Sequence, residues 1–128
     1  MIMSKLYKGF IETNGKASIE KLKNRTTWKT YDEVKNLNGF GGVLADDTIL
    51  IDIDDSDQSE ILMNIVEELQ LDCKVLCTSR GKHFLFKNHT IARNRTHVQL
   101  AVGLTADIKV GSKLSYEVIK IDGEERRS

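Results

Sequence analysis

The chain has 128 residues, and its 19 Lys and Arg balance its 19 Asp and Glu, so the formal net charge is zero. This length suits one domain with its own hydrophobic core, no apolar run approaches the ~20 residues that span a bilayer, and the N-terminus lacks the apolar core of a signal peptide. We therefore expect one soluble, intracellular domain over residues 1–128. The absence of proline, a residue common in linkers, also favours a single compact unit.

The residue pattern predicts both strands and helices, but not in a clean βαβ alternation. Short helices are expected at Ser18–Asn24 and Tyr31–Leu37, and the glycine-rich segment after them begins a strand at Val43–Ala45. An isoleucine-rich buried strand follows at Thr48–Asp54, and the apolar spacing from Ser56 to Leu71 is typical of an amphipathic helix. Further strands are predicted at Cys73–Ser79, Lys82–Lys87, Thr105–Val110 and Tyr116–Ile121. This order indicates an α+β fold.

Charge is segregated along the chain. Residues 46–72 contain ten acids and no Lys or Arg, whereas residues 80–113 contain seven bases and one acid. An acidic block followed by a basic block suits a site for cations beside a site for phosphates. Two solvated faces would give the same pattern, so this feature alone does not decide between them.

Two aspartates occur in the isoleucine-rich strand, although aspartate is disfavoured in strands. Strand alternation places Asp52 and Asp54 on one face, about 6.6 Å apart, and directs the isoleucines into the core. Carboxylates so close repel each other, and a divalent cation such as Mg²⁺, which takes oxygen ligands, would relieve the repulsion. A strand end that reaches solvent is the alternative interpretation.

A second segment predicts a β-hairpin whose two-residue loop is Arg80-Gly81. In that register Thr78 faces His83, and Cys77 pairs with Phe84 on the core face. The turn would then offer N–H donors and positive charge beside His83, which suits a triphosphate. An exposed hairpin tip with a lone histidine is the alternative.

A third segment, Thr105–Val110, also alternates between apolar and charged residues. Asp107 and Lys109 fall on one face, where they could form a simple ion pair. Combined with Asp52 and Asp54, however, Asp107 would supply a third metal ligand and Lys109 would reach a phosphate.

The order, spacing and strand context of these segments resemble the archaeo-eukaryotic primase superfamily, specifically the primase-polymerase domain of phage and plasmid replication proteins. The similarity extends from about Lys29 to the C-terminus and includes Phe40–Leu44. Its three motifs are Ile51–Asp55, Thr78–Phe86 and Ala106–Lys109.

The resemblance implies a fold, a set of site residues and a reaction. The fold would be an RRM-like palm, a mixed or antiparallel sheet with flanking helices. Catalytic acids that hold two divalent ions, Mg²⁺ or Mn²⁺, would be Asp52, Asp54 and Asp107. The phosphates of a nucleoside triphosphate would be bound by Ser79, Arg80, His83 and Lys109. The reaction would be template-directed nucleotidyl transfer to a primer or an initiating nucleotide.

The implied partners are nucleoside triphosphates, a DNA template and primer, and a helicase or accessory domain if the chain is a fragment of a longer replication protein. The setting would be the cytoplasm of a bacterial or archaeal host cell, with no membrane involved. We also expect Arg93 and Arg95, in a predicted polar loop at Asn88–Thr96, to contact the nucleic-acid backbone.

The chain departs from the family pattern in two motifs, which leaves the shape of the nucleotide pocket open. The second motif is the compact Ser79–Lys82 and lacks the usual extra glycine or proline, and Gly111–Lys113 leads directly from the third motif into another strand. The main alternative function is a catalytically silent nucleic-acid-binding module of a replication initiator. A metal-dependent nuclease is a third, but no general base or nucleophilic tyrosine can be placed near the acids.

Overall fold

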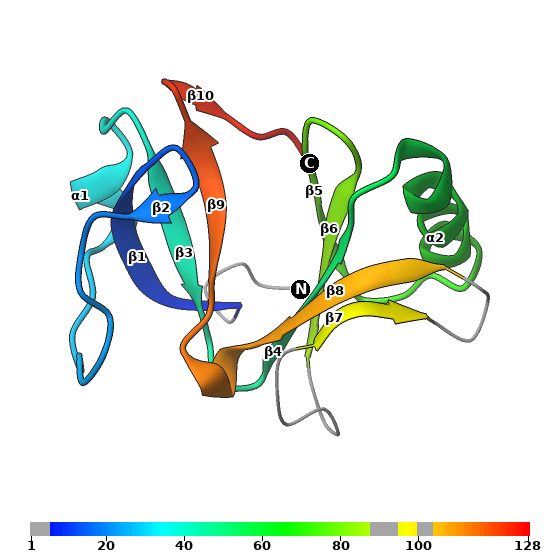
Figure 1. Cartoon of the computed structure of the whole chain (residues 1–128), viewed down its shortest axis with the longest axis horizontal. Helices are drawn as coiled ribbons and strands as arrows, with labels where there is room; N and C mark the ends of the chain where they lie inside the picture. Colours follow the sequence, from blue (N-terminus) through cyan, green and yellow to red (C-terminus); the bar gives the residue numbers. More distant parts are fainter. Residues whose placement is uncertain (1–5, 88–94, 100–103) are drawn as a thin grey trace.

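The computed structural model describes residues 6–87, 95–99 and 104–128. Two five-stranded sheets lie side by side, with strand orders β10-β9-β3-β1-β2 and β5-β6-β4-β8-β7 (Figure 1). The first sheet contains β1 (Tyr7–Asn14), β2 (Ala17–Ser18), β3 (Phe40–Leu44), β9 (Tyr116–Ile121) and β10 (Glu124–Glu125). The second contains β4 (Thr48–Ile53), β5 (Lys74–Cys77), β6 (Lys82–Lys87), β7 (Arg95–Gln99) and β8 (Thr105–Val110). Within the described ranges every strand pairing is antiparallel, which confirms an α+β fold with few helices.

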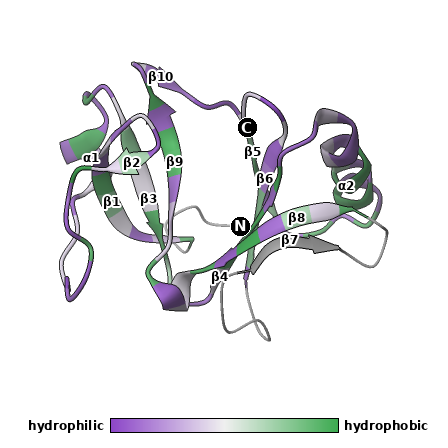
Figure 2. Ribbon diagram, viewed as in Figure 1, coloured by the Kyte–Doolittle hydropathy of each residue, from purple (hydrophilic) through white to green (hydrophobic). Residues whose placement is uncertain are grey.

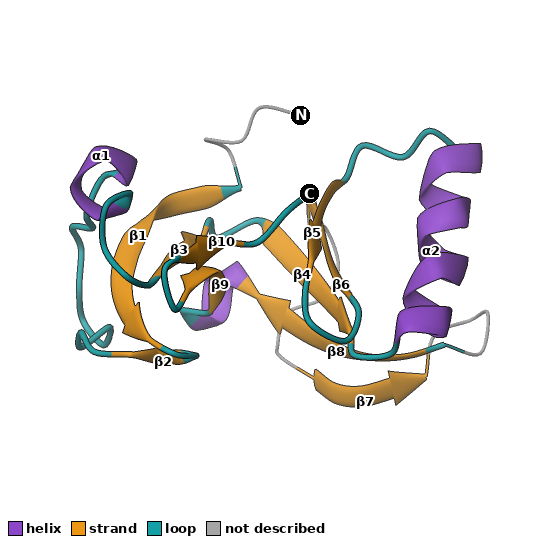
Figure 3. Ribbon diagram, turned by 90° about the horizontal axis from the view of Figure 1, so that it is seen from above, coloured by secondary structure: helices purple, strands orange, loops and turns teal. Residues whose placement is uncertain are grey.

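Helical structure is confined to α1 (Tyr31–Val34), α2 (Ser56–Glu68) and the 3₁₀ turn η2 (Gly111–Lys113) among the residues described. The second sheet lies between the first sheet and α2 (Figure 3). The cap residue Asp55 begins α2, because its side chain accepts the Gln58 N–H at 2.9 Å. This cap directly follows Asp54 and turns the chain from β4 into the helix. No described helix is long and apolar enough to cross a membrane.

The two faces of the second sheet pack into different cores because side chains alternate along its strands. On one face, Ile53, Phe84 and Ala106 pack with Val66 of α2. On the opposite face, Leu50, Leu76 and Leu85 pack against the first sheet, where they meet Leu6, Phe40, Leu44 and Ile119. The alternation is visible as changing colours along β8 (Figure 2). The face toward the first sheet is apolar only in part, and its remaining positions carry Asp52, His83 and Asp107.

Several element predictions are confirmed, including the strands at 82–87, 105–110 and 116–121. The helix predicted at Ser18–Asn24 is wrong, because Glu20 ties this segment to β1. The Glu20 carboxylate accepts the Glu12 N–H at 2.5 Å and forms ion pairs with Arg25 and Lys29. The strand β1 itself was not predicted.

The predicted hairpin register is also wrong. Cys77 lies opposite Lys82, and Leu76 opposite His83, so four residues, Thr78–Gly81, form the loop instead of two. The Thr78 side chain accepts the Gly81 N–H at 3.1 Å and thereby closes this wider loop. The register shift is two residues, and an even shift leaves each side chain on its predicted face.

Candidate functional site

A cleft of about 460 Å³ opens between the two sheets. The second sheet and its hairpin loop contribute Asp52, Asp54, Ser79, His83, Asp107 and Lys109 to its lining. These are six of the seven residues predicted to bind metal or nucleotide. The seventh, Arg80, is not among the lining residues and contacts Asp54 instead. The three sequence motifs therefore meet at one cleft.

Strand order explains why these residues meet. The central strand β4 has β6 on one side and β8 on the other, so Asp52 lies directly opposite both His83 and Asp107. Residues opposite each other in antiparallel strands have Cβ atoms about 4.5–5.5 Å apart. Motifs separated by more than 20 residues in sequence thus become immediate neighbours on one sheet face.

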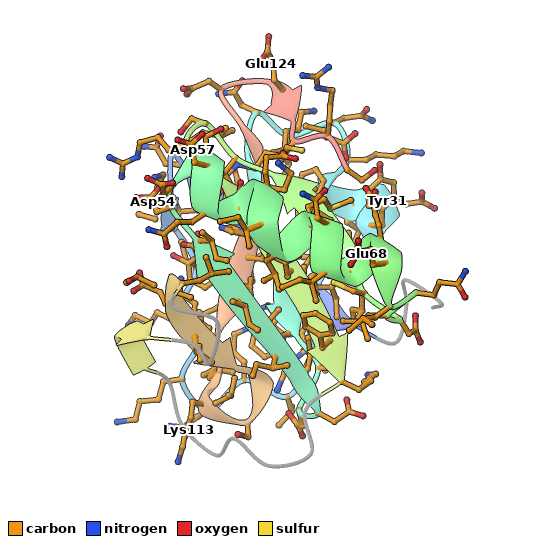
Figure 4. The ribbon with its side chains drawn as sticks, turned by 90° about the vertical axis from the view of Figure 1, so that its right-hand side faces the viewer. Tyr31, Asp54, Asp57, Glu68, Lys113 and Glu124 are labelled. Atoms are coloured by element: carbon orange, nitrogen blue, oxygen red, sulfur yellow. The ribbon has the colours of Figure 1, made fainter. Side chains whose placement is uncertain are left out.

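The loop between β5 and β6 brings further polar groups to the cleft. Gly81 packs so closely on the end of β4 that a Cβ atom at this position would lie 1.8 Å from the Ile53 carbonyl oxygen. This close approach places Arg80 beside Asp54, and the guanidinium donates to both carboxylate oxygens, at 3.1 and 2.5 Å. Figure 4 shows Asp54 next to Asp57, where α2 begins. Both members of the Arg80–Asp54 pair are more than half exposed, so the pair positions the loop more than it stabilises the fold.

His83 lies between two carboxylates at the floor of the cleft. Its Nδ1 is 2.8 Å from Glu117 Oε2, and its Nε2 is 3.6 Å from Asp52 Oδ1. Burial lowers the pKa of His83, but the hydrogen bonds and negative charges of Asp52 and Glu117 outweigh burial and raise the pKa above its ordinary value. For Asp52 the effect of burial has the opposite sign and raises the pKa. The neighbouring His83 more than offsets burial, so the pKa of Asp52 is lowered.

These contacts correct the expected repulsion between Asp52 and Asp54. Each carboxylate has a basic partner from the hairpin, His83 for Asp52 and Arg80 for Asp54. His83 and Arg80 therefore already balance the negative charge of Asp52 and Asp54, which was expected to be balanced by a metal ion.

The first sheet supplies the opposite wall, which the sequence did not reveal. Its contributions include Lys16, Tyr116, Glu117 and, from the segment after β10, Arg126. Glu117 is 1% exposed. The signal that could have found it is an acid that shares a strand face with apolar Ile119 and Ile121, because a buried acid needs a partner.

Of the two residues predicted to contact the nucleic-acid backbone, only Arg95 lies within the described part of the chain. Arg93 lies outside the described residues. Arg95 is the first residue of β7, at the edge of the second sheet, so it belongs to a strand and not to the predicted loop.

The donor set can be tested against the implied divalent ions. Carboxylate oxygens from Asp52, Asp54 and Asp107 are the ligand type that Mg²⁺ and Mn²⁺ prefer. In the described part of the chain, however, no three His, Cys, Asp or Glu side chains approach closely enough to hold one ion. The residues fit the ions chemically, and Asp54 would have to turn away from Arg80 to join Asp52 and Asp107.

Comparison with known proteins gives no relative, since no family model, curated protein or solved structure matches the chain. Function is therefore inferred from the chemistry of the cleft.

Proposed function

We propose that this protein is the catalytic domain of a DNA primase-polymerase, which transfers nucleotides from nucleoside triphosphates to a primer or an initiating nucleotide on a DNA template. The supporting observation is that the cleft between the sheets is lined by residues of all three motifs. In this proposal the second sheet, with α2 on its outer face, serves as the RRM-like palm.

In this proposal the basic and polar residues of the cleft would bind phosphates, and the acidic residues would bind divalent ions. Ser79, His83 and Lys109 offer hydrogen-bond donors to the triphosphate, and Arg80 stands at the rim. Lys16 and Arg126 add positive charge from the opposite wall, where they would meet template, primer or phosphate. A shared floor for both substrates would hold the primer 3′-hydroxyl near the α-phosphorus, so that a new P–O bond forms as pyrophosphate leaves.

The acids would hold the divalent ions. Asp52 and Asp107, directly opposite each other on β4 and β8, would be joined by Asp54. Bound Mg²⁺ or Mn²⁺ supplies charge neutralisation for the triphosphate and activation of the attacking hydroxyl.

One observation favours the alternative of a catalytically silent nucleic-acid-binding module. Arg80 occupies both carboxylate oxygens of Asp54, so one of the three acids is engaged within the protein. A silent module would keep this ion pair in the presence of metal and nucleotide.

Primer extension separates the two functions. The purified protein is incubated with a primed single-stranded DNA template, ribo- or deoxyribonucleoside triphosphates, and Mg²⁺ or Mn²⁺. We expect extension by the wild type and loss of extension in Asp52→Asn and Asp107→Asn. Asp57→Asn is the matched control, because Asp57 is an acid beside Asp54 at the start of α2 that does not line the cleft (Figure 4).

Two results would contradict the proposal. DNA binding without extension under any of these conditions would favour the silent module. Extension by Asp107→Asn at the wild-type rate would show that nucleotide transfer does not depend on the proposed set of three acids.

A further inference from the structure

Glu117 is a carboxylate enclosed between the two sheets. Its side chain is fully buried, although burying a charged group is costly unless it is paired and hydrogen-bonded. Both oxygens have partners: Tyr7 Oη donates to Oε1, and His83 Nδ1 lies 2.8 Å from Oε2. Tyr7 in turn accepts a hydrogen bond from Lys74 Nζ at 2.6 Å. A polar chain thus runs from Lys74 through the interior to the cleft.

This chain crosses the boundary between the sheets. Tyr7 and Glu117 belong to the first sheet, whereas Lys74 and His83 belong to the second. Beside it the same boundary is closed by apolar contacts such as those of Leu50 and Leu85. Replacing buried ionic groups by apolar ones is often neutral or stabilising, so cohesion of the sheets alone does not require an acid at this position.

The position of Glu117 determines the orientation of the His83 ring and which of its nitrogens faces the cleft. A carboxylate only accepts hydrogen bonds, so the Nδ1 atom facing it must carry a proton. With Nδ1 held in this way, the ring orientation is set and Nε2 faces Asp52 and the cleft, a role that second partners of histidines commonly fulfil. Nε2 lies 3.6 Å from Asp52 Oδ1, a long and weak contact. In the imidazolium both ring nitrogens are donors, so Nε2 can also donate to a phosphate oxygen.

We propose that Glu117 is the positioning residue of the nucleotide site: it holds the His83 ring so that Nε2 is directed at a phosphate of the bound triphosphate. The inference rests on the proposed function, and it assigns to Glu117 an effect on affinity that passes entirely through His83.

A double-mutant cycle tests this dependence. The affinity for mant-ATP and mant-dATP in Mg²⁺ is measured by fluorescence for the wild type, His83→Ala, Glu117→Leu and the double variant. Glu117→Leu should weaken binding about tenfold in the wild-type background, the effect of losing a charge-assisted hydrogen bond, and less than twofold in the His83→Ala background. Equal weakening in both backgrounds would overturn the proposal.

Further variants separate positioning from folding. Glu117→Gln keeps an acceptor for Nδ1–H and should bind within about threefold of the wild type, whereas Glu117→Asp withdraws the carboxylate and should behave like Glu117→Leu. If Glu117→Leu does not fold, Glu117→Asp replaces it in the cycle. Tyr7→Phe is the control: it removes the other hydrogen bond to Glu117, and it should lower the melting temperature while leaving nucleotide affinity within about twofold. A large affinity loss in Tyr7→Phe would indicate that the whole buried chain supports the cleft structurally, against a specific role for Glu117.

Nitrogen-15 spectra of the histidines provide a readout without any nucleotide. In the wild type His83 should carry a proton on Nδ1, and a ring protonated on Nε2 alone would overturn the proposed geometry. If the wild type neither binds nor extends, the proposed function fails together with the role of Glu117 in it. If the wild type binds and the cycle is additive, only this inference fails.

Discussion

Gly81 is the residue that allows the hairpin loop to lie against the end of β4. A Cβ atom at this position would be 1.8 Å from the carbonyl oxygen and 2.9 Å from the carbonyl carbon of Ile53. Both are backbone atoms, so no side-chain rotation relieves the overlap. We predict that Gly81→Ala displaces the loop from β4, and Ser79 and Arg80 with it.

The size of the effect follows from this geometry. Ordinary contact begins at 3.4 Å, so the loop and β4 must separate by about 1.6 Å. Overpacking of this kind costs about 1–3 kcal/mol, and loss of the exposed Arg80–Asp54 pair adds less than about 1 kcal/mol. We therefore expect the free energy of unfolding to fall by about 2–3 kcal/mol. A displacement of about 1 Å at a reacting site can reduce the rate by about 100-fold, and we expect a loss of nucleotide transfer of this order.

Urea denaturation measures the stability change, and primer extension at a temperature where all variants are folded measures the functional change. Gly123→Ala is the control, because Gly123 has φ of 83° and lies in the turn between β9 and β10. An alanine there should cost about 1 kcal/mol through its left-handed backbone and leave transfer unchanged. The reasoning is refuted if Gly81→Ala is as stable as the wild type, or if it transfers nucleotides as well as Gly123→Ala does.

Four further predictions concern the charged residues. The stability that His83 contributes should be fully present below the ordinary histidine pKa of about 6.5, and it should be lost as pH rises through the raised pKa of His83. In urea titrations the difference in free energy of unfolding between the wild type and His83→Gln should therefore shrink from pH 5 to pH 9. A constant difference would contradict this prediction. Asp52→Asn should lower the melting temperature without metal, because His83 loses an ion-pair partner. An unchanged or higher melting temperature would instead indicate that the carboxylates of Asp52 and Asp54 repel each other. Mn²⁺ should raise the melting temperature of the wild type but not that of Asp107→Asn, and an equal rise in both would exclude Asp107 as a ligand. Replacing Arg93 and Arg95 by alanine should reduce the salt slope of DNA binding by about one to two, and an unchanged slope would make them ordinary surface charges.

Much of the cleft's second-sheet wall could be predicted because strand alternation is a local property. Asp52 falls on the face opposite Ile51 and Ile53 whatever the strand pairs with, and Asp107 and Lys109 share a face for the same reason. The helix after Asp54 also follows locally, from its apolar spacing and its cap at Asp55.

The hairpin shows where local information ends. The side-chain faces of His83 and Phe84 were predicted correctly, but the register was wrong by two residues. The four-residue loop is favoured by the contact of Gly81 with Ile53, a residue 28 positions earlier in the chain. A tight two-residue turn is the better choice only when the hairpin is considered in isolation.

By itself, the sequence determined which residues can share a strand face, because that depends only on the two-residue period of the backbone. Only the tertiary structure decided that two sheets form, that β6 and β8 both flank β4, and that β9 brings Glu117 against His83. These arrangements depend on which apolar faces bury each other across long separations in the chain. The mixed sequence of β1 carries little period of its own, and this strand is held in place by its pairing with β3 and its contacts in the shared core.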